Sequence, residues 1–456
     1  MRLLIRIAAV SVAGAALFLA GKVNGLVQLE PSPLGGVFTA ATVAAALVVI
    51  ALALAGTGRG DAVVPGPEAT VLPMRAAFLV VSVSALIGLG WLRGITPPPL
   101  HDATPYHNDA ITLTECAAQT LMAGADPYAE LMLPSCYGAR GLGPDRTTPL
   151  RRGPFAAVPI YPTEEELDAA WGSFGPDMPF EWRLSYPSLS FLLIVPWVAS
   201  GWDTNVLYVL CLLAAMGLVL VRAPAGSRVF LLTGMLAAFS VTAFTVGGSG
   251  DLLYALPLVA AWLWRERRWS ALALGVAVSV KQLAWPFAAF YLIQVVAQCG
   301  WREAARRAAI AAGVFAAADL PFVLWDARAW ALGIVTPVAE PMFPRGTGLI
   351  ALPANGVGPL LPASAYLALE IAAAIGVLAL AWRTRRTSPE LGIALAMVPL
   401  WFAWRSLFSY FFLLPLFAFA GLARMPAGDL SPRAAAAAGA VLPIAMPAPP
   451  RPTAPR

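Results

Sequence analysis

The side chains best suited to chemistry lie in one polar segment, residues 96–183, and above all in its stretch 101–109, which reads His-Asp-Ala-Thr-Pro-Tyr-His-Asn-Asp. Asp109, and with a weaker claim Asp102, could act as a general base that takes a proton from a substrate hydroxyl. Both histidines of the chain are here, but their spacing matches no zinc-binding pattern. We therefore expect no metal site and assign His107 to substrate binding.

Isolated positive charges elsewhere in the chain could complement such a base. Lys281 lies between two apolar runs of half length, Arg405 lies between two long ones, and Arg345 ends the polar stretch 326–346. Charges placed in apolar sequence cost about 2.5–3.5 kcal/mol on insertion scales, so they mark functional sites by default. We predict that all three bind phosphate. The alternatives are a lysine that snorkels from a helix end and an arginine that anchors its helix at the membrane interface.

Several common catalytic motifs are missing from the sequence. It has no Walker-type phosphate loop, no zinc-protease motif and no soluble nucleotide-binding domain. Residues 247–251 (Gly-Gly-Ser-Gly-Asp) are too short for a phosphate-binding loop and predict a tight turn between helices, with Asp251 available for substrate binding. These absences argue against an ATP-driven pump and predict no cofactor. A substrate that is itself held in the membrane suits this chain better.

The elements that must position these residues are transmembrane helices. The 456 residues are 59% hydrophobic and only 12% charged, whereas soluble domains are about 25% charged. Apolar runs of about 18 or more residues, which indicate membrane-spanning helices, recur along the chain. The predicted fold class is therefore all-α and polytopic, with about 12 to 13 transmembrane helices. Arginine occurs in short clusters at helix ends, which indicates cytoplasmic anchoring and no nucleic-acid binding.

The expected organisation follows from the positions of the apolar runs. It comprises N-terminal transmembrane helices over 1–95, an extracytoplasmic loop over 96–183, a transmembrane core over 184–424 and a Pro/Ala-rich cytoplasmic tail over 425–456. With a cytoplasmic N-terminus, three crossings place the loop outside the plasma membrane. The segment 184–202 is interrupted by Pro187 and Pro196, so it either crosses or re-enters the membrane.

Two features predict structure inside the polar loop. Apolar residues at helical spacing favour an amphipathic helix over 109–122, begun by Asn108 or Asp109 as its cap and lying flat on the membrane surface. A capping role for Asp109 does not exclude catalysis. Cys116 and Cys136 share the loop, so they would form a disulfide if it faces an oxidising compartment.

Five short motifs occur in an order that is typical of one enzyme family. They are the acidic residue Asp109, a Gly-x-x-Pro-Tyr turn at 124–128, Tyr-Pro-x-Leu at 186–189, a turn at 248–251 and small residues ending in a lysine at 275–281. Over roughly residues 75–300 the chain resembles the polyprenyl-phosphate-mannose-dependent α-mannosyltransferases of glycosyltransferase family 87, which belong to the GT-C class. The turn at 248–251 differs from the family's Gly-Gln-x-Asn at both the Gln and the Asn.

The resemblance implies a GT-C-like fold and an inverting transfer of a sugar, mannose in that family, from a polyprenyl-phosphate donor to a lipid or glycan acceptor at the outer membrane face. Asp109 would be the base, and Lys281 and Arg405 the phosphate partners. We assign Tyr128 and Tyr186 to substrate binding. The expected partners are the lipid donor, the acceptor and the bilayer itself.

Two other functions remain open at this point. A transporter or lipid flippase also has broken helices near mid-chain and polar residues facing a cavity. The sequence, however, has no convincing internal repeat, and one long polar loop placed early is unusual for a transporter. A non-catalytic membrane assembly factor would keep the same helices without the activity.

Overall fold

The computed structural model describes residues 2–56, 108–131, 133–140, 142–172, 178–202, 204–246 and 248–425. The predicted all-α class is confirmed, because nearly all regular structure in these ranges is helical and the strands are two residues long. The predicted site residues Asp102 and His107, the apolar run 75–95 and the tail 426–456 lie outside the described residues.

Five helices are long and apolar enough to cross a membrane. They are α1 (Arg2–Leu29), α2 (Pro33–Leu54), α9 (Thr204–Arg222), α15 (Trp301–Ala339) and α17 (Ala363–Thr384). The helices α10 (Arg228–Ala237) and α11 (Phe239–Val246) form a bent pair, at 60°, that would make a sixth span. The chain is thus a polytopic, helical membrane protein.

The remaining core helices are shorter. They are α7 (Leu189–Leu192), α8 (Val195–Ser200), α12 (Leu252–Leu263), α13 (Ser270–Val280), α14 (Trp285–Cys299), α16 (Ala351–Ala354), α18 (Leu391–Leu395), α19 (Val398–Trp401) and α20 (Leu414–Leu422). The total of 12 to 13 crossings would require several of these, and residues outside the described ranges, to cross as well. That total stays a prediction.

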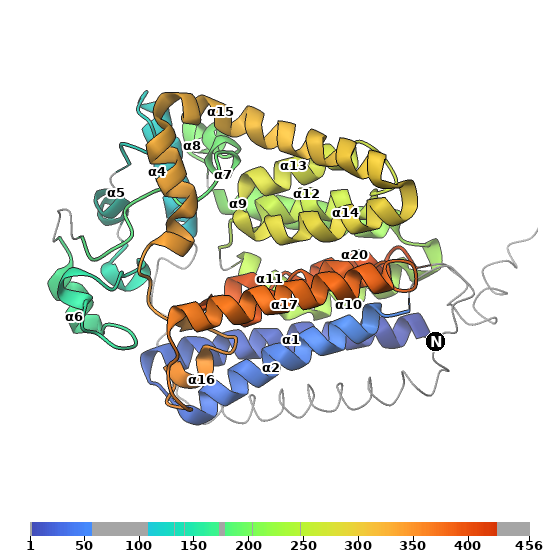
Figure 1. The fold of residues 1–456 in the computed structure, drawn as a ribbon, viewed down its shortest axis with the longest axis horizontal. Helices are drawn as coiled ribbons and strands as arrows, with labels where there is room; N and C mark the ends of the chain where they lie inside the picture. The colour runs from blue at the N-terminus through green and yellow to red at the C-terminus, as the bar shows by residue number, and fades with distance from the viewer. Residues whose placement is uncertain are drawn as a thin grey trace, which may run out of the picture.

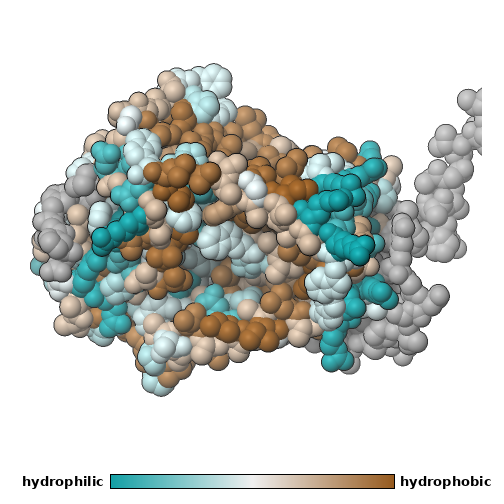
Figure 2. Space-filling view, turned by 45° about the horizontal axis from the view of Figure 1, so that its top comes forward, coloured by the Kyte–Doolittle hydropathy of each residue, from teal (hydrophilic) through white to brown (hydrophobic). Residues whose placement is uncertain are grey.

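The helices form two layers that run between two polar ends (Figure 1). One layer contains α12, α13, α14 and α15, and the other contains α1, α2, α10, α17 and α20. Hydrophilic residues gather at the two ends, and hydrophobic residues predominate between them (Figure 2). At one end lie the loop helices α4 (Asp109–Met122), α5 (Leu133–Ala139) and α6 (Glu164–Ala170).

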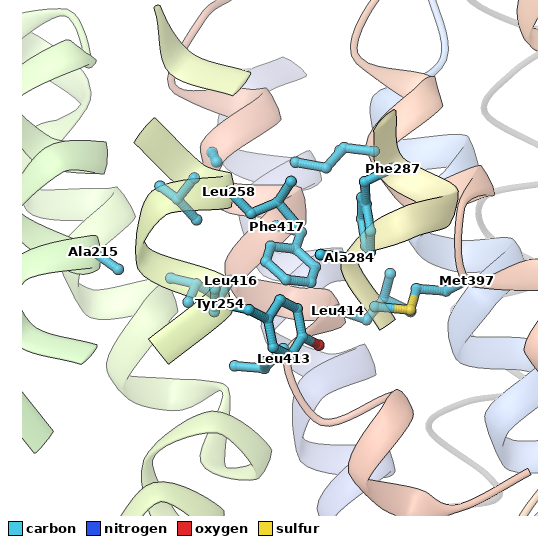
Figure 3. Packing of buried hydrophobic residues seen from close by; sticks show 14 of the residues in the cluster. Ala215, Tyr254, Leu258, Ala284, Phe287, Met397, Leu413, Leu414, Leu416 and Phe417 are labelled. Carbon is cyan, nitrogen blue, oxygen red and sulfur yellow. The ribbon is translucent and has the colours of Figure 1, made fainter. Parts of the chain in front are cut away.

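Close packing of large apolar side chains joins the two layers. Tyr254 and Leu258 of α12, Phe287 of α14 and Phe417 of α20 lie together at the centre (Figure 3), and all four are at most 1% exposed. The ring centroids of Phe287 and Phe417 are 5.0 Å apart in an edge-on contact, an arrangement that aromatic rings prefer to a face-to-face stack. The ends of these helices are therefore fixed relative to one another.

One expectation about where a helix ends needs correction. The stretch 326–346, expected as a polar loop, is helical as far as Ala339, and α15 only changes direction at Asp326 (φ −148°, ψ 96°). The Asp326 carboxylate accepts hydrogen bonds from the N–H groups of Arg328 and Ala329 at 3.0 and 2.9 Å, so it caps the second half of the helix. The apolar run that ends before Asp326 therefore marks a kink and not a helix end.

The helix predicted over 109–122 is confirmed as α4, with Asn108 as its cap. It does not lie flat on a membrane surface, since every residue from Ile111 to Ala118 is buried and the helix contacts α5, α7 and α8. The segment containing α7 and α8 spans only Leu189–Ser200, about 18 Å at 1.5 Å per residue. A bilayer core is about 30 Å thick, so this segment does not cross it as a helix and instead supports α4.

A disulfide between Cys116 and Cys136 joins α4 to α5, as the sequence allowed. It closes a short loop, with a sequence separation of 20 residues. By limiting the freedom of the unfolded chain, a cross-link of this size stabilises a fold by about 3 kcal/mol. It also fixes the middle of α4, about two turns beyond Asp109, against the rest of the loop.

Replacing both Cys116 and Cys136 with alanine should lower the free energy of unfolding by about 3 kcal/mol. The measurement is thermal unfolding of the purified protein in detergent, with and without a thiol reductant. The reductant should lower the melting temperature of the wild type to that of the double variant and leave the variant unchanged. Cys299→Ser, which alters a free and exposed cysteine, serves as the control. A wild type insensitive to reductant would contradict the expectation.

Candidate active site

Several residues predicted to form the site lie at the loop end of the molecule, beginning with Asp251 and Lys281. Asp251 stands at the start of α12 and Lys281 at the end of α13, where the backbone becomes extended (φ −154°, ψ 141°). Their side chains form an ion pair and are 4% and 13% exposed. The Lys281 ammonium also lies 4.8 Å from the centroid of the Tyr186 ring. Lys281 therefore does not snorkel to the surface, and its charge is balanced before any ligand arrives.

Asp109 is held in place by the hydrogen bonds of its neighbours. The Asn108 side chain accepts from the N–H of Ile111 at 2.9 Å and donates to the carbonyl of Gly248 at 3.0 Å. The Tyr137 hydroxyl donates to the backbone carbonyl of Asp109 at 2.9 Å. Within the described ranges the Asp109 carboxylate accepts only from the N–H of Ala110, at 2.8 Å, and forms no ion pair. Asn108 is the cap, so the Asp109 carboxylate is not needed for that role.

The two predicted arginines lie side by side on neighbouring strands. The strands β1 (Arg345–Gly346) and β2 (Arg405–Ser406) are parallel, with Arg345 opposite Arg405. This close approach requires Gly346, which has φ +138° and where a Cβ atom would lie 2.0 Å from the carbonyl oxygen of Ser406. Only a residue without a side chain fits there.

Arg345 and Arg405 differ in their partners. One nitrogen of the Arg345 guanidinium donates to Gln28 at 2.6 Å and another to the Tyr161 hydroxyl, while the group stacks 4.5 Å from the centroid of the Tyr161 ring. Arg405 is partly exposed, and no residue of the described chain forms an ion pair or hydrogen bond with its side chain. Arg405 is thus the predicted phosphate partner that remains free to bind an anion.

Glu181, which the sequence did not single out, also belongs to the polar loop. Its N–H donates to the carbonyl of Thr148 at 2.8 Å, and its Oε1 atom is buried without a hydrogen-bond partner. Burial raises the pKa of the Glu181 carboxyl to about 7. The Ser185 hydroxyl and Arg405 oppose that rise, whereas the Asp109 carboxylate adds to it.

Asp109 and Arg405 thus each act on the Glu181 carboxyl group. The Tyr161 hydroxyl has the same surroundings: burial raises its pKa, Arg345 and Arg405 oppose the rise, and Asp109 adds to it. Two carboxyl groups and an unpaired guanidinium at the polar end of an apolar bundle can perform two tasks together. One carboxylate can accept a proton, and the guanidinium can stabilise negative charge on a leaving group.

The predicted substrate-binding tyrosines have different positions. Tyr128 is 3% exposed, packs edge-on against Phe191 and Phe322 and donates its hydroxyl proton to the Tyr186 carbonyl at 2.8 Å. It therefore positions the 186–189 segment and offers almost no surface to a substrate. Tyr186 is partly exposed and covers Lys281, so it remains a candidate for substrate contact.

Several contributors to the site were missed because nothing in their local sequence marks them. Glu181 stands between Phe180 and Trp182, a carboxylate between aromatic residues, which was the only local signal. Tyr161 and Gln28 reach the site only through the tertiary fold, on the loop and on α1. No group of three His, Cys, Asp or Glu side chains in the described ranges could hold a metal ion.

Removing the charge of Lys281 should destabilise the fold. Lys281→Met leaves the Asp251 carboxylate buried without a partner, which costs about 3–5 kcal/mol. The double variant Lys281→Met/Asp251→Leu should recover most of that loss, because neither charge then remains. Unfolding of both variants in detergent gives the comparison, and Lys22→Met, at the other lysine of the chain, is the exposed control. Equal stability of Lys281→Met and the wild type would contradict a structural role for the pair.

Glu181 should make stability depend on pH. Its pKa rises from an ordinary 4.5 to about 7 on folding, so between these values the folded chain binds its proton more tightly than the unfolded chain. Stability must then fall as pH rises through this window and level off above about 7. Glu181→Gln should abolish the part of the fall in melting temperature that Glu181 causes between pH 4.5 and 7. Glu164→Gln, at an exposed residue, should leave the fall unchanged. An unchanged pH response in Glu181→Gln would contradict the raised pKa.

Comparison with known proteins leaves the function to be inferred from the site and the sequence motifs. No protein-family model matches the chain, and neither a curated protein nor a solved structure matches it.

Proposed function

We propose that the chain is a membrane glycosyltransferase of the GT-C class that moves a sugar, mannose by the resemblance of its motifs, from a polyprenyl-phosphate donor to a lipid or glycan acceptor. The observation that carries the proposal is that one acidic and one basic group near the same carboxyl group are both free to bind a substrate. Asp109 and Arg405 have no ion pair within the described residues, and both influence Glu181. A proton acceptor and an anion receptor are the two groups that this transfer needs.

The proposed reaction is a direct displacement. The Asp109 carboxylate takes the proton of an acceptor hydroxyl, and the hydroxyl oxygen attacks the anomeric carbon of the sugar. The bond from that carbon to the phosphate oxygen breaks, and its electron pair leaves with the phosphate. The configuration at the anomeric carbon inverts. Arg405 stabilises the charge that develops on the phosphate, because a guanidinium can donate two parallel hydrogen bonds to it.

The other predicted phosphate partners have supporting roles in this proposal. Lys281 is paired with Asp251 and holds the ends of α12 and α13 together under the site. Arg345 is hydrogen-bonded to Tyr161 and Gln28. These bonds fix strand β1, which pairs with the strand β2 that contains Arg405. Arg345 still contributes positive potential toward a phosphate group, but Arg405 is the group that can contact it.

The proposed location is the outer face of the plasma membrane. The loop end contains the Cys116–Cys136 disulfide, and disulfides persist in oxidising compartments. The opposite end contains the arginine clusters that favour the cytoplasm. A lipid donor reaches such a site from within the bilayer, so no nucleotide-binding domain is needed.

One observation favours the second candidate, a transporter or lipid flippase. Glu370 lies within the candidate span α17, is partly buried, and no ion pair or hydrogen bond of its side chain is found in the described structure. Carboxylates inside spans often line substrate pathways. Transport does not require the free carboxylate of Asp109 or the free guanidinium of Arg405 at the loop end. The transferase is therefore the better supported function.

The test is transfer of radiolabelled sugar from a panel of polyprenyl-phosphate donors by purified protein. Asp109→Asn keeps the shape of the side chain and removes its basicity, so the rate should fall about 100- to 10,000-fold. Arg405→Gln should raise the KM for the donor about tenfold or more, because a charge-assisted hydrogen bond is lost. The melting temperature of each variant shows whether the fold is intact.

Asp168→Asn, at an exposed residue of α6, is the matched control for Asp109→Asn and should transfer at the wild-type rate. Undiminished transfer by Asp109→Asn would show that Asp109 is not the base. Transport of a labelled lipid without any transfer, lost in Glu370→Gln, would favour the second candidate.

A further inference from the structure

The end of the molecule opposite the candidate site, on the right in Figures 1 and 2, carries a second set of charges. We call it the arginine patch, and its members are Arg267, Arg268, Arg302, Arg306, Arg383, Arg385 and Arg386. Two contacts connect the three segments on which they lie: Arg268 pairs with Glu303 at 3.0 Å, and the rings of Trp301 and Trp382 are 5.7 Å apart. The patch is therefore one continuous surface over the α12–α13 turn, the start of α15 and the end of α17.

The positive charge of the patch is not balanced within the described chain. Glu303 already has three arginine partners, Arg268, Arg306 and Arg307, at 3.0, 3.8 and 3.0 Å. The neighbouring acids Glu266 and Glu390 are likewise paired, with the arginines Arg222, Arg265 and Arg424.

Arg302, Arg383 and Arg386 are exposed, and the described residues provide none of them with an ion pair. The sequence of the tail, 426–456, adds no net negative charge, since it contains one aspartate against three arginines. Within the described residues, the surface between α15 and α17 thus has an excess of guanidinium groups that can bind an external anion.

The setting of these arginines indicates where the anion comes from. Only 17% of the apolar window of α15 and 6% of that of α17 is buried inside the molecule, so both helices face lipid. Trp301 and Trp382, at the ends of these two helices, are 70% and 36% exposed. Tryptophan is enriched at the level of lipid headgroups. Arg302 and Arg383 adjoin these two residues in the sequence and therefore lie at the same depth.

We propose that the arginine patch binds an anionic phospholipid, and best one with two phosphates, between the start of α15 and the end of α17. Guanidinium groups on both helices would hold the phosphates by paired hydrogen bonds. The acyl chains would lie along the exposed apolar surfaces of the two helices. Basic pockets between transmembrane helices bind cardiolipin in this way. Inorganic phosphate has the same charge chemistry but no acyl chains, so it should bind far more weakly.

This proposal does not depend on the proposed function. None of its residues belongs to the site of Asp109, Glu181 and Arg405, and a transporter with the same surface would bind the lipid equally well.

The experiment measures cardiolipin binding to the full-length, delipidated protein by native mass spectrometry in detergent, with phosphatidylcholine as the neutral comparison. Arg302→Gln and Arg383→Gln, one on each helix, should each weaken cardiolipin binding about fivefold, the usual contribution of one basic residue at a membrane surface. The triple variant with Arg386→Gln should lose over a hundredfold, or about 3 kcal/mol. Arg328→Gln, an exposed arginine elsewhere on α15, is the matched control and should bind as the wild type does.

Three results would overturn the proposal. Equal affinity for cardiolipin and phosphatidylcholine would show that the patch does not recognise charge. Wild-type affinity in both single variants would place the lipid elsewhere. Displacement of cardiolipin by millimolar inorganic phosphate would show a site for a soluble anion. Because the single variants remove only exposed side chains, folding stays intact and each outcome can be interpreted.

Discussion

The need to balance deeply buried charges in an apolar bundle shapes this structure. A charged side chain removed from water is costly unless it is paired and hydrogen-bonded, and the Asp251–Lys281 ion pair meets that need where α12, α13 and the polar loop come together. The pair holds the extended residue at the end of α13, Tyr186 lies over it, and Asn108 bonds to the turn that precedes Asp251. The position of Asp109 follows from these contacts.

The two ends of the bundle satisfy this requirement differently. At the arginine end, Glu390 accepts from Trp262 and from both terminal nitrogens of Arg265, and this fully buried cluster connects α12 to the segment before α18. Its acids are saturated with partners. At the loop end the acids Asp109 and Glu181 have no cation of their own within the described residues, although Arg405 is near. The described acids of the arginine end are thus all engaged in holding helices together, whereas two acids of the loop end stay available for a ligand.

The sequence allowed much of this arrangement to be predicted, where the signal is local. The cap at Asn108, the helix that follows it and the break at Lys281 can be read from residue types and spacing. The kink at Asp326 and the unpaired carboxyl of Glu181 could not be predicted, because both depend on which distant segment packs against them. The pairing of Lys281 with Asp251, which leaves Arg405 as the predicted phosphate partner without an ion pair in the described part of the chain, is likewise a result of tertiary structure.

The disulfide has a consequence for how such a protein matures. Thiols stay reduced in the cytoplasm and are oxidised outside it, so in the proposed orientation the loop would acquire its cross-link only after translocation. Until then α4 would be held by packing alone, without its covalent link to α5. Bond formation between Cys116 and Cys136 would then be a late step of maturation, completed in the compartment where the site is proposed to work.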